Sequence, residues 1–585
     1  MKNFRKILSI LSALNYKKKF FLFIILTFFG TILEMLGVSM IIPIITVLYD
    51  QNYFYSLNKF TSYLLFYNLN QNELVFYLFL FLFAFFTIKS IFLTYLIYFQ
   101  NNFIYSLKEK LSNFIFARYL YKNYLWHKKI NSSILIRNTN TEVMYFGFSM
   151  ISFTNMLMEI FILMGITTLL FIYNFQISIL ISIIFMLPFA LFLKNIKKKI
   201  KFWGIERQQI DANILKNLQQ GFGSVKDVIL KDKQVFFLNN FKILNKKSKI
   251  LDIYYNLFQN LPKIFLELLA ITGIFVIIYY SFEIKNYNSL YVLTFLSLFA
   301  VSAFRILPSI SRIISNFQTY KYYVPSIDVL NDEIKIDTLL QENKISFEAN
   351  DLDTHASQNF YAFKKFEIKS LNFQYSNSDS VLFDNLNFDF KSGTTLGIVG
   401  KSGVGKSTFV DIIMGLIDRA LGSIYVNDVN LSKKNVKKWR QLISYVPQNI
   451  YLLDDTISKN IAFGETDEQI RPDKIRECLN YSQMLNFVNS LPQKENTLVG
   501  ERGARLSGGQ IQRLAIARAL YSECKIIIFD EATSALDKTT EEDILHLIKS
   551  LKTKKTILMI SHNLDSLKYC DKIFEVKNKK IIEKE

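Results

Sequence analysis

The stretch GKSGVGKS at residues 400–407 decides how this sequence folds. It satisfies the pattern GxxxxGK[ST], in which a glycine-rich loop joins a buried strand to a helix. An apolar, strand-like run, Thr395–Val399, precedes the loop, and a helix-forming segment, Thr408–Leu416, follows it. We therefore expect an α/β domain in which backbone N–H groups of the loop surround phosphate at the positive end of a helix.

Two side chains of this loop indicate the ligand. The ammonium group of Lys406 suits the β- and γ-phosphates of ATP, and the hydroxyl group of Ser407 suits the Mg²⁺ that accompanies ATP. A chance glycine-rich turn is rare between a strand and a helix. We predict that ATP is bound by the whole loop and the threonine after it: Gly400, Lys401, Ser402, Gly403, Val404, Gly405, Lys406, Ser407 and Thr408.

Two further apolar runs end in polar groups that suit phosphate chemistry. The run Ile526–Phe529 is followed by Asp530 and Glu531. A carboxylate at the end of a buried strand suits Mg²⁺, and the next carboxylate is placed to activate water as a general base. His562 follows the run Thr556–Ile560 and is predicted to contact the γ-phosphate and the water. A histidine after a strand is usually structural, but two phosphate motifs favour a catalytic role here.

A second glycine-rich element predicts a dimer. The sequence LSGGQ at residues 506–510 precedes a strong helix, Ile511–Leu520. Small residues at a helix start form an anion site, and one ATP needs only one such site for its phosphates. The surplus site is explained if two copies face head to tail, each covering the nucleotide of the other. We expect this part of the ATP site to comprise Ser507, Gly508, Gly509 and Gln510.

The first half of the chain is membrane-like. A helix needs about 20 apolar residues to cross a bilayer. Six runs meet or approach that length: Phe20–Leu48, Leu74–Phe99, Phe148–Tyr173, Ile177–Leu193, Ile264–Tyr280 and Leu290–Ile314. We predict that each run spans the membrane.

The distribution of charge gives the orientation of these spans. Residues 1–340 hold 35 Lys and Arg against 17 Asp and Glu, whereas the remainder is nearly balanced. The basic residues gather at 17–19, 108–137 and 194–249, in alternate loops between the apolar runs. This pattern places the N-terminus and the second half in the cytoplasm, and it indicates contact with anionic lipid instead of nucleic acid.

The sequence divides into two expected domains joined by a linker. We expect residues 1–325 to form the transmembrane domain, 326–364 a polar linker and 365–585 the nucleotide-binding domain. The long cytoplasmic loops 100–147 and 194–260 are predicted to extend the spanning helices. The outer loop 49–73 is either a short interfacial helix or an aromatic-rich loop. The cysteines, Cys478, Cys524 and Cys570, lack metal-binding spacing and are expected to be reduced.

Residues 365–585 resemble the ATPase domain of ABC transporters. The resemblance rests on the phosphate loop, YVPQ at 445–448, LSGGQ at 506–510, IIIFDE at 526–531, SALD at 534–537 and His562. It implies that Tyr375 stacks on adenine, that Gln448 contacts Mg²⁺ and the catalytic water, and that Asp537 contributes to the ATP site. Residues 497–503 are similar to the segment with which exporters contact their membrane domain. Six spans before one such domain are similar to an exporter half-transporter of the type IV fold, whose coupling helices correspond to the two cytoplasmic loops.

Four cations in the apolar runs are candidates for a substrate cavity: Lys89, Lys263, Arg305 and Arg312. Intramembrane charges are costly and usually functional, and arginine and lysine suit phosphate or pyrophosphate. The alternatives are internal pairing and, for the two arginines, a position near the cytoplasmic interface. Lys263 and Glu267 are four residues apart, and Lys89 has Glu34 or Glu159 as a possible partner.

The whole chain is similar to bacterial lipid-linked oligosaccharide flippases of the protein N-glycosylation pathway. The similarity rests on residues 34–43, 262–267, 305–312 and 448–455. It implies that cavity arginines engage a pyrophosphate and that an external helix follows the first span. Lys89 and Lys263 stand where arginine is expected, so their charge is kept but forked hydrogen bonding is lost.

Taken together, the sequence predicts a membrane all-α domain of six helices followed by an α/β P-loop nucleotide-binding domain. The predicted activity is ATP hydrolysis, with Mg²⁺, that drives a homodimer to flip a lipid-linked oligosaccharide across the bacterial inner membrane. Export of another anionic lipid, a peptide or a drug is the alternative within transport. An ATP-gated channel and a non-transport ABC ATPase are the alternatives from other classes.

Overall fold

The computed structural model describes residues 2–40, 71–173, 175–279, 289–338, 362–375, 380–532, 538–552 and 554–584. These residues belong to two compact units. Unit 1 comprises Met1–Lys122 and Ile130–Ile345, and unit 2 comprises Asn123–Lys129 and Ser346–Glu585.

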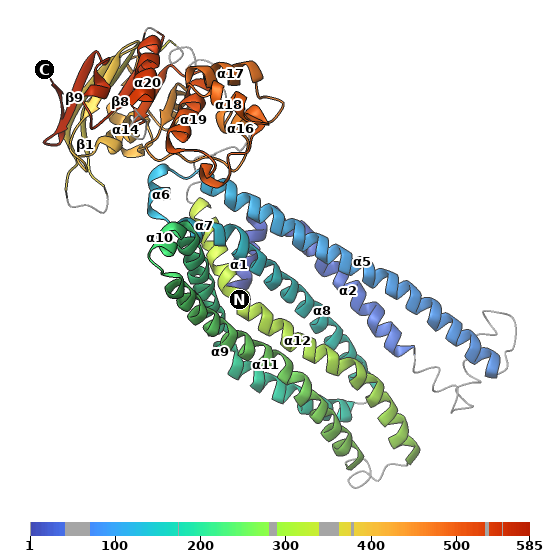
Figure 1. Cartoon of the computed structure of the whole chain (residues 1–585). Helices are drawn as coiled ribbons and strands as arrows, with labels where there is room; N and C mark the ends of the chain where they lie inside the picture. The colour runs from blue at the N-terminus through green and yellow to red at the C-terminus, as the bar shows by residue number, and fades with distance from the viewer. Residues whose placement is uncertain are drawn as a thin grey trace. The chain divides into compact units, whose positions relative to one another are not determined.

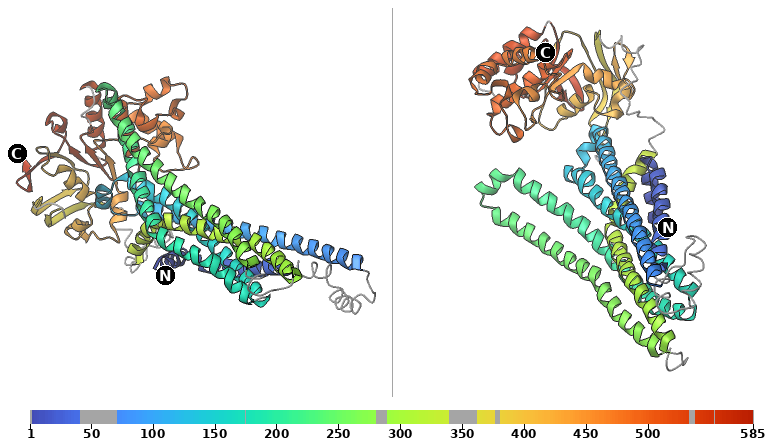
Figure 2. Two further views of the ribbon diagram at one scale, coloured as in Figure 1. Left: turned by 90° about the horizontal axis from the view of Figure 1, so that it is seen from below. Right: turned by 90° about the vertical axis from the view of Figure 1, so that its right-hand side faces the viewer.

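Unit 1 is built from long helices that run alongside one another (Figures 1 and 2). They are α2 (Lys17–Ser39), α5 (Gln71–Leu120), α8 (Val143–Tyr173), α9 (Phe175–Gly223), α11 (Gln234–Tyr279) and α12 (Ser289–Thr338). The described residues of each predicted apolar run lie mainly on one of these helices, and residues 41–48 of the first run and residue 280 of the fifth are outside the described residues. Within the described residues, four stretches are long and apolar enough to cross a membrane: Lys17–Gly37, Val75–Leu120, Ser132–Thr168 and Gln234–Phe275.

The two long loops predicted to be cytoplasmic, 100–147 and 194–260, are largely helical, as predicted. Helix α5 continues without a break to Leu120, and α9 continues to Gly223. After α9 come the short helix α10 (Val225–Leu230) and then α11. A π-helical turn, η1 (Asn138–Glu142), joins α7 (Ser132–Arg137) to α8.

Helix α12 packs along α8 and α11 through an apolar face. Ile306, Ile310 and Ile313 are spaced by four and three residues, so they lie on one side of α12. They pack in one buried cluster with Ile166 of α8 and Leu266 of α11. The apolar periodicity of these helices therefore serves contact between helices as well as contact with lipid.

The polar end of α12 corrects one boundary. Lys6 and Ser9, on the amphipathic helix α1 (Lys2–Ala13), bond to Asp328 at 2.7 Å and to Asn331 at 2.6 Å. Residues 326–338 are polar because this part of α12 contacts α1, and they remain helical. The predicted linker 326–364 therefore begins too early. The predicted interfacial segment 49–73 lies outside the described residues apart from 71–73, which begin α5.

Unit 2 contains two sheets. The larger has the order β10-β9-β3-β8-β7-β6; β9, β3, β8, β7 and β6 are parallel to one another, and β10 pairs with β9 in the antiparallel direction. Its strands are β3 (Thr395–Val399), β6 (Ile443–Val446), β7 (Ile526–Asp530), β8 (Thr556–Ile560), β9 (Lys572–Lys577) and β10 (Lys580–Lys584). The smaller antiparallel sheet has the order β2-β1-β4-β5, formed by β1 (Lys365–Phe373), β2 (Phe383–Lys391), β4 (Ile424–Val426) and β5 (Val429–Asn430).

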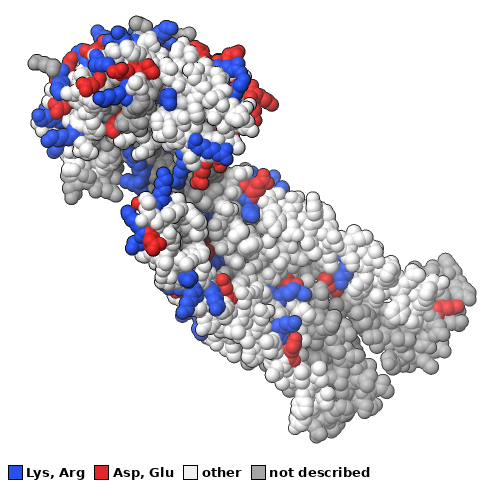
Figure 3. All heavy atoms as spheres, viewed as in Figure 1, with Lys and Arg blue, Asp and Glu red and all other residues white. Residues whose placement is uncertain are grey.

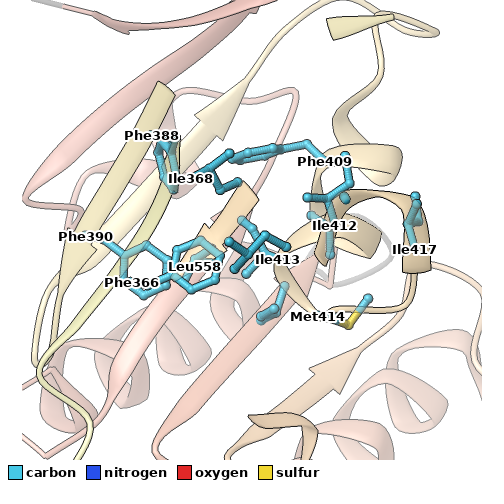
Figure 4. Packing of buried hydrophobic residues seen from close by; sticks show 14 of the residues in the cluster. Phe366, Ile368, Phe388, Phe390, Phe409, Ile412, Ile413, Met414, Ile417 and Leu558 are labelled. Carbon is cyan, nitrogen blue, oxygen red and sulfur yellow. The ribbon is translucent and has the colours of Figure 1, made fainter. Parts of the chain in front are cut away.

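Successive residues of the central strands enter cores on opposite faces of the larger sheet. In β7, Ile526 and Ile528 pack on the side of α14 (Lys406–Ile413), where aromatic residues of the smaller sheet also gather (Figure 4). Ile527 and Phe529 pack on the other side with α19 (Gly508–Tyr521) and α20 (Lys538–Leu551). Burial on both faces explains why the strands of a parallel sheet are continuously apolar. All three cysteines are free.

A short segment that is distant in sequence completes unit 2. Residues 123–129, which include α6 (Tyr124–Lys129), lie between α5 and α7 in the chain. Leu125 packs against the buried cluster that contains Phe366 and Ile413. Unit 2 is therefore assembled from two separate parts of the sequence.

Candidate nucleotide site

The sheet topology gathers the predicted catalytic residues at one edge. Strands β3, β8, β7 and β6 are parallel neighbours. The phosphate loop follows β3, His562 follows β8, Asp530 ends β7 with Glu531 directly after it, and Gln448 follows β6. Since the carboxyl ends of parallel strands share one edge, these residues meet where α/β proteins generally bind ligands.

Glycine is required at two turns of the phosphate loop. Gly403 has φ 78° and Gly405 has φ 111°, values that L side chains rarely adopt. At Gly405 a Cβ atom would also lie 3.1 Å from Leu382. The chain turns here into α14, which begins at Lys406. Loop residues Lys401, Ser402 and Ser407 are exposed, and Val404 is half-buried.

Lys406 is held inside the loop. Its Nζ donates to the carbonyl oxygens of Gly400 at 2.7 Å and Lys401 at 3.2 Å, and lies 3.4 Å from His562 Nε2. The side chain is buried, and this burial lowers the pKa of Lys406 against the opposing attraction of Glu531 and Asp530. The loop thus orients a cation in the position where the motif predicts phosphate.

Asp530 is a buried carboxylate with a partner that the sequence analysis missed. The Tyr445 hydroxyl donates to Asp530 Oδ2 over 2.8 Å. Burial raises the pKa of Asp530, and the Tyr445 hydrogen bond opposes that shift. Tyr445 stands three residues before Gln448 in the same motif, so its place on β6 was the signal that could have found it.

The predicted general base is held between the other two predicted catalytic residues. Gln448 Nε2 donates to Glu531 Oε2 at 2.6 Å, and His562 Nε2 lies 2.7 Å from Glu531 Oε1. Glu531 has φ 51°, which is strained for a residue with a side chain and is typical of functional sites. Its backbone N–H donates to Ile560 of the neighbouring strand β8. The structure therefore brings Gln448, Glu531 and His562 together.

Tyr375 lies beside the phosphate-loop helix. Its hydroxyl is 3.0 Å from the Thr408 hydroxyl, and its ring meets Phe373 edge-on with centroids 5.1 Å apart. The predicted adenine-stacking residue and the end of the predicted phosphate loop are thus neighbours.

The LSGGQ motif forms the capped start of α19. Ser507 Oγ accepts from the backbone N–H of Gln510, while Gln510 Oε1 accepts from the backbone N–H of Ser507. This reciprocal pair orients Gly508 and Gly509 in the first turn. In the described part of the chain, no hydrogen bond of residues 506–510 reaches residues 400–408. The predicted Asp537 and the motif 534–537 lie outside the described residues.

The donor set fits Mg²⁺. The part of the chain that the structure describes holds no cluster of three or more His, Cys, Asp or Glu suited to a metal. Mg²⁺ uses few carboxylates, together with water and phosphate oxygens. Ser407 offers a hydroxyl, Asp530 a carboxylate, and Gln448 an amide oxygen, since its amide nitrogen donates to Glu531.

The predicted cavity cations are arranged differently. Lys89 Nζ lies 2.8 Å from Glu34 Oε2, and both side chains are buried between α5 and α2. Internal pairing, the alternative interpretation, therefore holds for Lys89. Arg312 binds Glu159 through Nε at 2.5 Å and Nη2 at 3.3 Å, which ties α12 to α8.

For the other two predicted cavity cations, Lys263 and Arg305, the structure describes no ion pair. Lys263 is exposed on α11, and the described residues supply no ion pair for it, with Glu267 or otherwise. Arg305 lies on α12, and its side chain is outside the described residues.

The family comparison identifies unit 2. Residues 383–534 match the family model described as ABC transporter. These residues form an ABC transporter ATPase domain. The ABC ATPase domain therefore contains both the phosphate loop and the LSGGQ motif within the matched range, and ATP is its nucleotide.

Relatives of named function match this chain to different extents. The chain is 27% identical over 435 residues to an ATP-dependent lipid A-core flippase of Pseudoalteromonas atlantica, covering 74% of this chain and 71% of that protein. It is 36% identical over 218 residues to the Haemophilus influenzae protein of the same name, covering 37% of each. It is 38% identical over 218 residues to human ATP-binding cassette sub-family B member 5, of which the chain spans 17%.

A solved structure extends the likeness over almost the whole chain. The structure of a bacterial Atm1-family ABC exporter with ATP bound matches with a TM-score of 0.72 and 18% identity. The match covers 95% of this chain and 93% of that chain. The chain has the ABC exporter fold, with a helical transmembrane part and an α/β ATPase domain, as the sequence predicted.

Proposed function

We propose that two copies of this chain form an exporter in which ATP hydrolysis drives an anionic lipid across the bacterial inner membrane. The N-terminus and the ABC ATPase domain lie on the cytoplasmic side. The observation that carries the catalytic part is the convergence of Lys406, Asp530 and Glu531 at the carboxyl edge of the sheet, with Gln448 and His562 bonded to the same carboxylate.

Each side chain has a separate role in hydrolysis. Lys406 neutralises the charge of the phosphates, and the backbone N–H groups of the loop orient the phosphates. Ser407, Gln448 and Asp530 would hold Mg²⁺, which would supply further neutralisation of the phosphates when bound. Glu531 accepts a proton from the attacking water, while Gln448 and His562 fix the direction of its carboxylate. Tyr375 supports the adenine ring.

A dimer accounts for the two phosphate-binding motifs. The phosphate loop begins α14 and LSGGQ begins α19, and these helices contribute to different buried clusters. In a head-to-tail pair, the capped start of α19 in one copy covers the nucleotide bound by the other. ATP binding then closes the pair, and hydrolysis reopens it.

The substrate class is supported by the lipid flippase named among the relatives, which matches over 74% of this chain. We infer that the substrate is a lipid with a phosphorylated glycan head, and that it is a polyprenyl-pyrophosphate oligosaccharide. Since Lys89 and Arg312 have carboxylate partners, the phosphate contacts fall mainly to Lys263 and Arg305. A lipid A-core glycolipid is the second candidate, because the relatives from Pseudoalteromonas atlantica and Haemophilus influenzae named above are lipid A-core flippases.

Reconstitution separates these substrates. The full chain in proteoliposomes is assayed for ATP-dependent flipping, and for ATPase stimulation, with a lipid-linked oligosaccharide, a lipid A-core glycolipid and a neutral phospholipid. We expect the lipid-linked oligosaccharide to give the largest stimulation and to be flipped. Lys263→Gln should lower flipping while basal ATPase persists, with Lys434→Gln in unit 2 as the control. Stimulation by lipid A-core alone would select the second candidate, and no response to either glycolipid would contradict the proposal.

A further inference from the structure

The segment 123–129 contacts the phosphate-loop side of unit 2 through several side chains. Leu125 packs on the buried cluster that also contacts Tyr375. Asn123 Nδ2 donates to Asp418 Oδ2 at 3.4 Å. Lys128 Nζ donates to Asp411 Oδ2 at 2.9 Å and lies 4.6 Å above the Tyr124 ring. This segment lies outside residues 383–534, which match the ABC transporter model.

Asp411 is a buried carboxylate on the phosphate-loop helix. It lies on α14 and is only 6% exposed. Burying a carboxylate is costly unless it is paired and hydrogen-bonded. Burial raises the pKa of Asp411, and its hydrogen bond with Lys128 opposes that shift. Among the described residues, Lys128 is the cation that bonds to Asp411.

The position of Asp411 links this ion pair to the nucleotide. Asp411 is four residues after Ser407, so both lie on one face of α14. Its negative charge also contributes to raising the pKa of Asp530, after burial and Glu531. Asp411 and Glu531 therefore both act electrostatically on Asp530, which lies where a triphosphate is expected. An uncompensated charge on Asp411 would repel that ligand.

We propose that Lys128 is a positioning residue of the ATP site, because its ammonium group neutralises Asp411 and so keeps α14 compatible with bound nucleotide phosphates. Lys128 touches neither the phosphate loop nor the catalytic carboxylates by any bond described above, and acts through Asp411. The inference concerns nucleotide binding and holds whichever lipid is moved.

Nucleotide affinity tests the proposal without hydrolysis. The full-length chain in lipid nanodiscs is titrated with a fluorescent ATP analogue, with and without Mg²⁺. Lys128→Met should raise Kd about three- to tenfold, since the pair joins a buried carboxylate to a side chain that is 43% exposed. Lys128→Arg, which keeps the charge, should stay within about twofold of the unsubstituted chain. Lys434→Met, an exposed lysine of the same unit, is the matched control.

A double-variant cycle shows whether Lys128 acts through Asp411. If it does, Lys128→Met should have little effect once Asp411→Asn has removed the carboxylate, so the double variant should bind within about twofold of Asp411→Asn alone. Thermal unfolding of each variant without nucleotide reports whether the fold is intact. Unchanged affinity in Lys128→Met overturns the proposal. The proposal is also overturned if Lys128→Met lowers nucleotide affinity in the Asp411→Asn background. This comparison remains available if Lys128→Met alone does not fold.

Discussion

Charged side chains are organised in opposite ways in the two units. At the nucleotide site of unit 2, Lys406, Asp530, Glu531 and His562 converge from separate strands, and Glu531 is shared by two partners. In the long helices of unit 1, Lys89 meets Glu34 and Arg312 meets Glu159, each in a separate pair. Figure 3 shows that, on one face, charged side chains are sparser over the described surface of the long helices than over unit 2.

The difference reflects what each environment tolerates. A lone charge among apolar helices is costly, so a carboxylate from the neighbouring helix neutralises it. A converging set of charges is also costly, and such sets are found where a ligand completes the charge balance. The comparison separates charges that stabilise the protein from charges that await a ligand, and substitutions can test it.

The largest effect is expected at the converging site. Glu531→Gln keeps the shape but removes the general base, so ATP hydrolysis should fall about 10²- to 10⁴-fold. Nucleotide binding should persist, because Lys406 and the loop are unchanged. Phosphate release measures the rate, and Glu542→Gln on the exposed face of α20 is the control. Hydrolysis above a tenth of the normal rate would show that Glu531 is not the base.

The second-largest effect is expected on stability, at the buried Lys89–Glu34 pair of unit 1. Lys89→Met leaves Glu34 buried without this cation, which should lower the free energy of unfolding by about 3–5 kcal/mol. Adding Glu34→Met should restore most of the loss, since two apolar side chains can replace a buried ion pair. Thermal unfolding in detergent measures both variants. A loss below about 1 kcal/mol would place Lys89 among the charges that await a ligand.

The smallest effect is expected at the second pair. The Arg312 side chain is 46% exposed, so Arg312→Met should cost no more than about 1 kcal/mol of unfolding free energy. The same unfolding assay compares it directly with Lys89→Met. A destabilisation equal to that of Lys89→Met would mean that the two pairs are equivalent. Loss of lipid flipping with unchanged stability would support a substrate contact for Arg312.

The sequence predicted the nucleotide site well because its motifs are local. The bounds of β3, β7 and β8 agree with the predicted apolar runs, since a parallel strand buried on both faces must be apolar throughout. Glycines with positive φ explain why the phosphate loop is recognisable as a short pattern. The identity and order of neighbouring residues are sufficient to predict buried strands and a phosphate loop.

The sequence predicted contacts between distant segments poorly. Nothing near Lys128 indicates that it meets Asp411, and the role of Tyr445 depends on β6 lying beside β7. The polar residues after 325 suggested a linker, whereas they face α1 along a continuing helix. For Lys89, two acidic partners were equally compatible with the sequence, and helix packing selected Glu34.

The sequence by itself determined the order of apolar helices and α/β segments and the chemistry of the phosphate loop, because periodicity, apolar length and glycine conformation are properties of neighbouring residues. Only the tertiary structure decided which charges pair, which converge on the nucleotide and which short segment joins unit 2. Those outcomes depend on distances between residues far apart in the chain, over which electrostatic energy changes steeply in a low-dielectric interior.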